Sequence, residues 1–232
     1  MKRWSGIFCL MFYFGMASSA QNLSDVITIT GEPGAQQFPD VAYNIRDNTF
    51  LVVWEHVVDV NLNDINGILV NGDTGQPMGS PVTLITGIHS FEAPEVVYNS
   101  QDNEFLVVAR RVNDNMAVAQ RVSAQGQPVG DIVDIGRSNG PTFFDPAARA
   151  RVVAVAYNAT DNRFIVGLGE PMTAQILLPD LSLDYLVENI GVGTNPALAW
   201  SSVQNVFLMA WEDRQIRSTG SENLSARLIS ND

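Results

Sequence analysis

The chain has 232 residues, of which 46% are hydrophobic and 16% charged, and its formal net charge is −12. So acidic a chain is a poor partner for nucleic acid and for anionic membrane surfaces, which bind basic proteins. Its length suits a single domain with a large hydrophobic core, which a lone cysteine cannot supplement with an intrachain disulfide.

Residues 1–20 have the pattern of an export signal. Lys2 and Arg3 give a positive start, residues 6–16 form an apolar core, and residues 18–20 are small, as signal peptidase requires. The apolar core is too short to span a bilayer as a helix. We therefore expect cleavage after this segment and a secreted or periplasmic protein, with no membrane insertion after cleavage.

One phrase recurs four times along the rest of the chain. The copies cover residues 39–54, 94–109, 153–168 and 196–211. Each copy predicts a short strand, a turn rich in Asn and Asp, and a second strand that is apolar on both faces. In the first copy these are residues 41–43, 44–48 and 50–54.

Two further strands follow in each clear repeat. Polar and apolar residues alternate loosely in the fourth strand, as expected of an outer strand that is half exposed. Between the third and fourth strands, glycines provide the positive backbone angles that tight turns need. The third strands are expected at 116–122 and 224–229, the turns at 73–79 and 124–130, and the fourth strands at 82–86 and 132–135.

Buried inner strands, half-exposed outer strands and four strands per repeat are typical of an all-β fold, the β-propeller. We expect one domain, residues 21–232, with four blades of four antiparallel strands. The repeat units are about 38–87, 93–136, 150–190 and 195–232, with residues 25–31 added to the last.

The last repeat stops before its fourth strand, and residues 26–31 resemble residues 82–87. This predicts that the N-terminal strand completes the last blade and closes the ring as a monomer. The alternative is that two chains pair their open ends into a larger ring.

The phrase Pro-Asp-Val-Ala-Tyr-Asn-x-x-Asp-Asn-x-Phe-Leu-Val-Val-Trp-Glu, with Gln-Arg-Val-Ser-x-x-Gly at 120–126, resembles repeats of bacterial exported proteins. Such repeats are read as propeller-forming, and most have no assigned activity. The resemblance covers nearly all of the mature chain and implies an architecture. The third copy departs most, since it lacks the proline and matches loosely over 172–189.

Two repeat positions carry the candidate binding residues. The first lies just after the second strand, where the charge of the side chains differs from blade to blade. Such variation indicates either a binding rim or an exposed edge whose sequence has changed without functional constraint. The second lies at the start of the first strand, near the expected axis. The residues are Glu55, His56, Arg110, Arg111, Glu170, Glu212 and Asp213 at the first position, and Asp40 and Glu95 at the second.

Several catalytic classes lack their residues. Lys2 is the only lysine, so the mature chain has no lysine for a Schiff base. Two histidines cannot build a multi-histidine zinc site, and no Gly-x-Ser-x-Gly motif is present. Residues 59–66 are predicted to form a long polar loop without the glycine and glutamate of an EF-hand, a calcium site being the alternative.

The composition and motifs therefore favour an exported, non-catalytic binding module that recognises a glycan or a protein partner through one propeller face. No catalytic residue, resident metal or cofactor is predicted. Two alternatives stay open. Asp40 and Glu95 could serve a carbohydrate-active, glycoside-cleaving enzyme, which needs two carboxylates. The chain could instead be a scaffold protein of the cell envelope.

Overall fold

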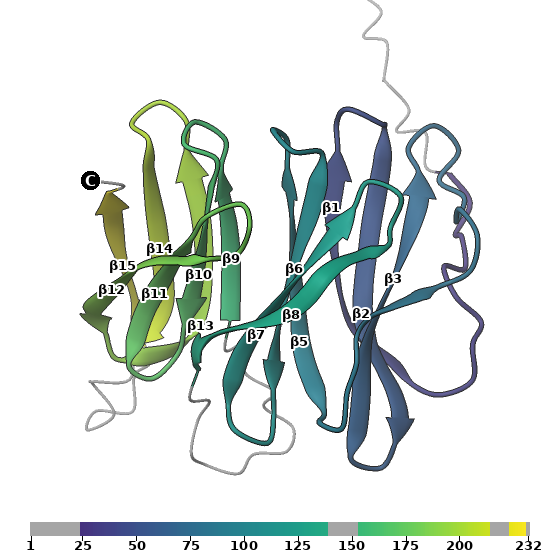
Figure 1. Cartoon of the computed structure of the whole chain (residues 1–232), viewed down its shortest axis with the longest axis horizontal. Helices are drawn as coiled ribbons and strands as arrows, with labels where there is room; N and C mark the ends of the chain where they lie inside the picture. Colours follow the sequence, from purple (N-terminus) through teal and green to yellow (C-terminus); the bar gives the residue numbers. More distant parts are fainter. Residues whose placement is uncertain (1–23, 139–152, 214–222, 231–232) are drawn as a thin grey trace, which may run out of the picture.

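The computed structural model describes residues 24–138, 153–213 and 223–230, which form strands and turns without a helix (Figure 1). The strands make four antiparallel sheets whose order follows the chain. They are β1 (Gln36–Asn44), β2 (Thr49–Asp59), β3 (Leu62–Asn71) and β4 (Val82–Ile85) in blade 1; β5 (Phe91–Asn99), β6 (Glu104–Arg111), β7 (Met116–Ser123) and β8 (Pro128–Arg137) in blade 2; β9 (Val153–Asn158), β10 (Arg163–Leu168), β11 (Met172–Leu177) and β12 (Leu183–Gly191) in blade 3; and β13 (Gly193–Ser201), β14 (Val206–Asp213) and β15 (Asn223–Ser230) in blade 4.

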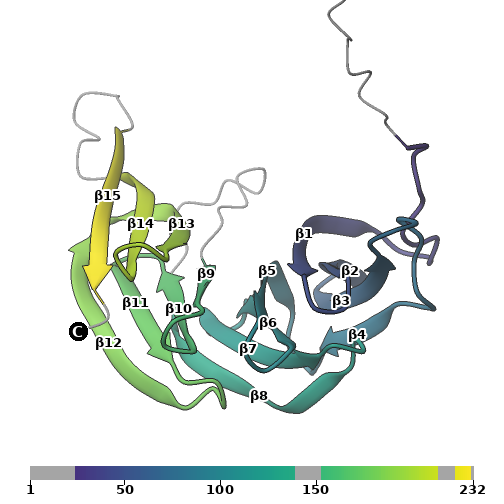
Figure 2. The same cartoon turned by 90° about the horizontal axis from the view of Figure 1, so that it is seen from above.

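The four sheets stand side by side around a common axis. Seen from above in Figure 2, the first strand of each sheet, β1, β5, β9 or β13, lies nearest the axis, and the later strands lie further out. The inner strands β1, β5, β9 and β13 also contact one another in that sequence. The chain is therefore a β-propeller with four blades, as the repeat predicted.

Each pair of consecutive blades shares a hydrophobic core. Between blades 1 and 2, Leu51 and Val53 of β2 pack with Phe105 and Val107 of β6. The alternate residues of β6, such as Leu106, belong to the core between blades 2 and 3. A third core joins blades 3 and 4. The second strands of the two middle blades, β6 and β10, are thus buried on both faces, which explains their unbroken apolar sequences.

The Asn-rich turns take the left-handed backbone conformation. Asn48, Asn103, Asn162 and Asn205 have φ between 52° and 60°. Asparagine tolerates this region better than other residues that carry a side chain. The glycines predicted in the turns between the third and fourth strands also have positive φ, as at Gly126, where φ is 75°.

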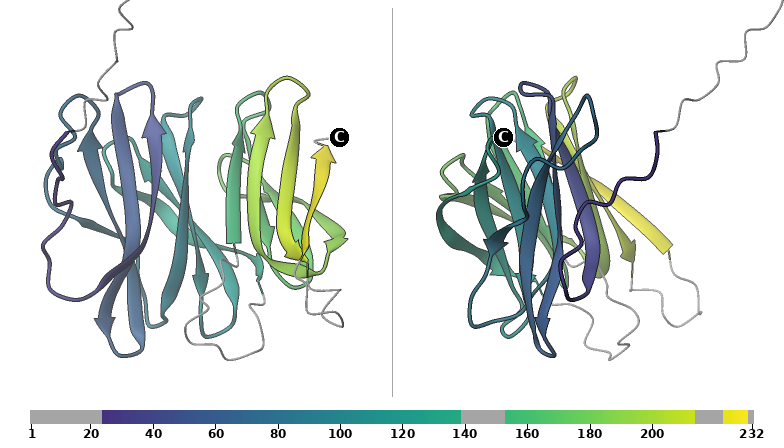
Figure 3. Two further views of the ribbon diagram at one scale, coloured as in Figure 1. Left: turned by 180° about the vertical axis from the view of Figure 1, so that it is seen from behind. Right: turned by 90° about the vertical axis from the view of Figure 1, so that its right-hand side faces the viewer.

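The strand expected from residues 25–31 is absent. The fourth sheet has three strands in the described part of the chain, and residues 24–35 form none. Figure 3 shows this segment beside blade 1, at the opposite end of the row of blades from β15. The side chain of Ile29 in this segment packs against an apolar face of blade 1 that contains Trp54, Ile68 and Val70.

This placement corrects the predicted closure. A short β-branched segment needs a sheet edge to pair with, and the free edge of β15 lies at the other end of the row of blades. Residues 59–66 also differ from expectation: β2 runs to Asp59 and β3 begins at Leu62, so the predicted polar loop is a tight hairpin between two strands.

Candidate axial binding site

A wide concavity of about 440 Å³, largely open to solvent, lies along the inner strands of all four blades. An aromatic residue from each blade lines it, at the same position of each repeat. Small apolar side chains fill the spaces between these rings. The aromatic residues are Tyr43, Tyr98, Tyr157 and Trp200, and the small apolar ones include Val41, Val97, Val155 and Leu198. We call this concavity the axial pocket.

A phenylalanine from the second strand supports each tyrosine. Tyr98 lies directly opposite Phe105 in the pairing of β5 with β6, and their ring centres are 5.3 Å apart at an interplanar angle of 54°. Tyr157 and Phe164 are 5.2 Å apart in the same arrangement. Tilted aromatic pairs of this kind are stabilising, so the pocket rings are held from behind.

The hydroxyl of each tyrosine is fixed by its own turn. Tyr98 Oη donates to Asn103 Oδ1 at 2.8 Å, and Tyr157 Oη donates to Asn162 Oδ1 at 2.9 Å. In blade 4, Trp200 Nε1 donates to Asn205 at 3.1 Å. Burial raises the pKa of both Tyr98 and Tyr157 above the ordinary value, so these phenols remain protonated donors at neutral pH.

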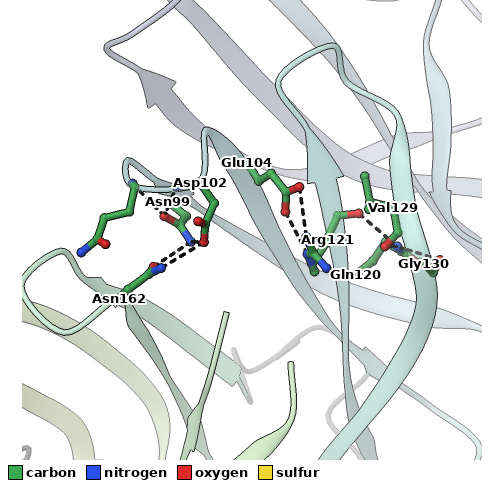
Figure 4. Close-up of polar contacts among 9 residues, drawn as sticks. Asn99, Asp102, Glu104, Gln120, Arg121, Val129, Gly130 and Asn162 are labelled. Atoms are coloured by element: carbon green, nitrogen blue, oxygen red, sulfur yellow. Dashed lines mark hydrogen bonds and ion pairs between the residues drawn. The ribbon is translucent and has the colours of Figure 1, made fainter. Parts of the chain in front are cut away.

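The same turns join neighbouring blades through an amide–carboxylate contact (Figure 4). Asn162 Nδ2 donates to Asp102 Oδ2 at 3.1 Å, and Asn99 Nδ2 donates to Asn162 Oδ1 at 3.0 Å. Blades 1 and 2 repeat this pattern, with Asn103 donating to Asp47 at 3.0 Å. We call this contact the interblade clasp; it explains why the phrase keeps Asn, Asp and Asn at fixed spacing.

The axial pocket therefore presents a rigid ring of aromatic side chains. Tyr43 is 43% exposed and Val41 is 54% exposed, so the pocket is open to solvent at blade 1. Its lining combines apolar and aromatic walls with a few fixed polar groups, which is the chemistry of small-ligand sites.

Most of the predicted rim residues have partners inside the fold. Glu55 is 1% exposed and accepts from the backbone N–H of Ala93 at 2.7 Å and from Asn63 Nδ2 at 3.4 Å. Ala93 has φ 51° and lies in a β-bulge of β5 between Glu92 and Glu95. Glu55 thus holds a strained turn of the neighbouring blade.

The two arginines form ion pairs. Arg110 lies 3.1 Å from Glu92, the residue opposite it in β5. Arg111 bonds both Asp114 and Asp134, each at 2.8 Å. The guanidinium of Arg111 lowers the pKa of Asp114, chiefly through their hydrogen bond.

The remaining predicted rim residues lie apart from one another, on different blades. His56 Nδ1 lies 3.0 Å from Gln36 Nε2, and Asp213 accepts from Ser225 Oγ at 2.7 Å. Glu55 and His56 lie within β2, which continues to Asp59. Arg110, Arg111, Glu212 and Asp213 lie at the ends of β6 and β14, and Glu170 lies in the turn after β10.

The axial carboxylates are placed by the inner strands. Asp40 Oδ2 accepts from the backbone N–H of Val96 at 2.8 Å, which links β1 to β5. Glu95 takes the equivalent position in β5, opposite Val108 of β6. Asp40 thus contributes to blade packing.

An aromatic residue recurs at this position in all four copies of the repeat and marks their alignment, but the sequence did not lead us to predict it as a site. The signal was present, because an aromatic ring at one position of every inner strand must gather at the axis of a propeller. Within the described residues, no cluster of three or more metal-binding side chains occurs. No helix in that part of the chain is long and apolar enough to cross a membrane.

Comparison with known proteins supports the fold. No family model and no curated protein matches the sequence. Among solved structures, the chain is similar to a protein of unknown function from Dyadobacter fermentans, with 14% identity, a TM-score of 0.59, and coverage of 84% of this chain and 52% of that one.

Two other similar structures have TM-scores just below 0.5. One is the β-propeller domain of the Trilobed protease from Pyrococcus furiosus, with 8% identity, a TM-score of 0.49, and coverage of 84% of this chain and 54% of that one. The other is the exo-β-1,3-galactanase from Phanerochaete chrysosporium, with 10% identity, a TM-score of 0.48, and coverage of 77% and 44%. The chain spans about half the length of these structures. At these identities the likeness concerns the fold alone.

Proposed function

We propose that this chain is a non-catalytic, exported binding module and that its axial pocket binds a short glycan. One observation carries the proposal: four aromatic residues, one from each blade, line a single concavity of about 440 Å³. The residues two positions earlier in each repeat, Val41, Val96, Val155 and Leu198, line the same concavity and give it apolar walls.

The chemistry of the lining suits a sugar. An aromatic ring offers an apolar face to the C–H groups of a pyranose, and a tyrosine also has a polar end. Each tyrosine hydroxyl donates to an asparagine, which leaves its oxygen lone pairs to accept from a sugar hydroxyl. A preformed pocket of this kind needs little ordering on binding.

The placement of the carboxylates favours binding over hydrolysis. Asp40 accepts a backbone hydrogen bond across two blades, and Glu55 is buried in the structural contact with Ala93. A glycosidase needs two carboxyl groups that face the scissile bond. Asp40 and Glu55 instead accept hydrogen bonds that hold neighbouring blades together.

The test is a glycan array followed by calorimetry with the best sugar. Tyr43→Ala removes the most exposed tyrosine of the pocket, and the loss of one stacking ring is expected to weaken affinity about tenfold, or about 1.4 kcal/mol. Tyr185→Ala, in β12 and outside the pocket, is the matched control and should bind as the wild type does.

Failure to bind any glycan, with an intact fold, would refute the glycan proposal. Equal affinity of the Tyr43→Ala variant and the wild type would place the sugar site elsewhere. Capture of a protein that competes at Tyr43 would replace the glycan with a protein ligand at the same pocket.

A further inference from the structure

Blade 4 has one covered face and one open face. In β14, Phe207, Met209 and Trp211 are buried in the core with blade 3. The alternate residues, Leu208 and Ala210, point to the other side of the sheet, because successive side chains of a strand alternate between faces. In the other blades, this second side packs on the following blade.

The open face is apolar and exposed. Strand pairing places Leu208 beside Leu228, Ala210 beside Ala226, and Glu212 beside Leu224. Leu208 is 44% exposed, Leu228 is 66% exposed and Leu224 is 83% exposed. We call this surface, Leu208, Ala210, Leu224, Ala226 and Leu228, the open face. Such a row of large apolar side chains is typical of an interaction surface.

The outer edge of blade 4 is also unpaired. In the described chain β15 pairs only with β14, whereas blades 1 to 3 each have a fourth strand at this position. A groove of about 230 Å³ lies between β15 and β12. In blades 2 and 3, a glutamine of the third strand, Gln120 or Gln175, donates to a backbone carbonyl of the fourth strand. The equivalent residue of the third strand in blade 4 is Arg227.

Blade 1 has the complementary surface. The repeat aligns three residues of β2 with three residues of β14 that face the preceding blade. They are Phe50, Val52 and Trp54, aligned with Phe207, Met209 and Trp211. Within the described residues, which begin at residue 24, no blade precedes blade 1. Instead, the N-terminal segment lies on this face, with Ile27 and Ile29 partly buried and Val26 fully exposed.

We propose that a second copy of this chain binds blade 4: its blade 1 packs on the open face, and its residues 25–31 add a fourth strand to β15. This segment already lies on the side of blade 1 where the outer strand of a preceding blade would be. The reciprocal contact closes a two-fold ring with twice the four blades of one chain. Strand addition of this kind is a common mode of peptide recognition.

The arrangement of the blades favours a second copy over the chain's own N-terminus. Among the described residues, blades 1 and 4 share no hydrophobic core, and the N-terminal segment from residue 24 and β15 lie at opposite ends of the row of blades (Figures 2 and 3). Most of this chain, 84%, also matches 52% of the longer structure from Dyadobacter fermentans.

The junction between copies lacks the interblade clasp. The fourth repeat has Ser201 and Gln204 where the other repeats have Asn and Asp, and these two bond each other at 2.8 Å. Asn48 of blade 1 donates to Asp73 of its own blade at 2.8 Å. The contact between copies thus depends on apolar burial and strand pairing, so we expect an equilibrium between monomer and dimer.

Blade 1 supplies the register of the added strand. There Val82 pairs with Gly67, and Thr83 pairs with Asn66. Transferred to blade 4 through the repeat, this pairing places Val26 of the second copy opposite Ala226. A Val26→Cys, Ala226→Cys variant, in a Cys9→Ser background, should form a disulfide between copies under oxidation.

The expected product on a non-reducing gel is a covalent dimer, whereas either cysteine alone should remain monomeric. A disulfide within one chain, seen as a faster-migrating monomer, would show that the chain closes on itself and would overturn the proposal. The absence of any disulfide would overturn it as well.

The second measurement is light scattering of the purified chain across a range of concentrations. The wild type should rise to twice the monomer mass, and Leu228→Glu should remain monomeric, because the charge would be buried on the open face. Ile88→Glu, an equally simple change at a 91% exposed residue between blades 1 and 2, should dimerise as the wild type does. A monomeric wild type, or a dimeric Leu228→Glu variant, would overturn the proposal.

Discussion

At the scale of single residues, the repeated phrase encodes contacts between blades. Asn103 has a left-handed backbone, accepts from Tyr98 and Asn44, and donates to Asp47. One side chain thus supports its own turn, the pocket ring and the preceding blade. Such a network explains why the phrase recurs almost unchanged, whereas the loops between repeats vary.

The Asn103→Ala substitution should destabilise the fold by about 2 kcal/mol, since it removes several hydrogen bonds at a backbone conformation that alanine disfavours. Asn48→Ala is the matched control. It should cost only about 1 kcal/mol, because Asn48 bonds Asp73 of its own blade and no preceding blade. Urea unfolding measures both changes, and equal losses would contradict the clasp.

The Arg111–Asp114 pair predicts a pH dependence. Because Arg111 lowers the pKa of Asp114, the pair stabilises the fold fully above the ordinary carboxyl value of 3.8, and this contribution is lost as the pH falls through the lower folded-state pKa. Arg111→Met should therefore make unfolding less sensitive to acid, by at most about 1 kcal/mol near the surface.

The control for this prediction is Arg46→Met, whose guanidinium donates to the backbone carbonyl of Ser100. Unfolding free energies measured from neutral to acid pH should show the wild-type dependence in this variant. The same acid dependence in Arg111→Met and the wild type would contradict the assignment.

At the scale of elements, the rim residues show the limit of sequence reasoning. The alignment of repeats placed Glu55 and Arg110 just after the second strands, whereas the structure places Glu55 within β2 and Arg110 within the last two residues of β6. It could not show that Glu55 would meet the bulge at Ala93, because that contact depends on the register between blades. The charge at this repeat position varies because each residue has a different partner inside the fold; Arg110, for example, pairs with Glu92.

Glu55→Ala should accordingly lower stability by about 2 kcal/mol, because it leaves a buried backbone N–H unpaired. Binding of any axial ligand should not change. Glu32→Ala, at an exposed loop position, should stay within about 0.5 kcal/mol of the wild type. Thermal and urea unfolding check the first part, and a glycan that binds the wild type but not the folded Glu55→Ala protein would restore Glu55 as a binding residue.

The predicted N-terminal strand is instructive for the same reason. Residues 26–31 resemble the fourth strand of blade 1 in sequence, and local sequence alone would make them a strand. A strand also needs a free edge, and in one chain the free edge of β15 lies at the other end of the molecule. The sequence thus identified a segment that resembles a fourth strand, but not where that segment lies in the folded chain.

At the scale of the whole molecule, the four-bladed architecture followed from the sequence, because apolar strands buried on both faces require a blade on each side. The position of the pocket followed less directly. Tyr43, Tyr98, Tyr157 and Trp200 were visible as repeat markers, but their convergence depends on the blade arrangement. The identity of a ligand is not encoded in that arrangement, and only a binding measurement supplies it.

The most direct test of the central claim is calorimetry of the best array glycan with three proteins: the wild type, Tyr43→Ala, and the rim variant Arg110→Ala, Arg111→Ala. The account predicts that the pocket variant binds about tenfold more weakly and that the rim variant, if folded, binds as the wild type does. Normal binding by Tyr43→Ala, with binding lost in the folded rim variant, would contradict the axial site and place the ligand on the rim.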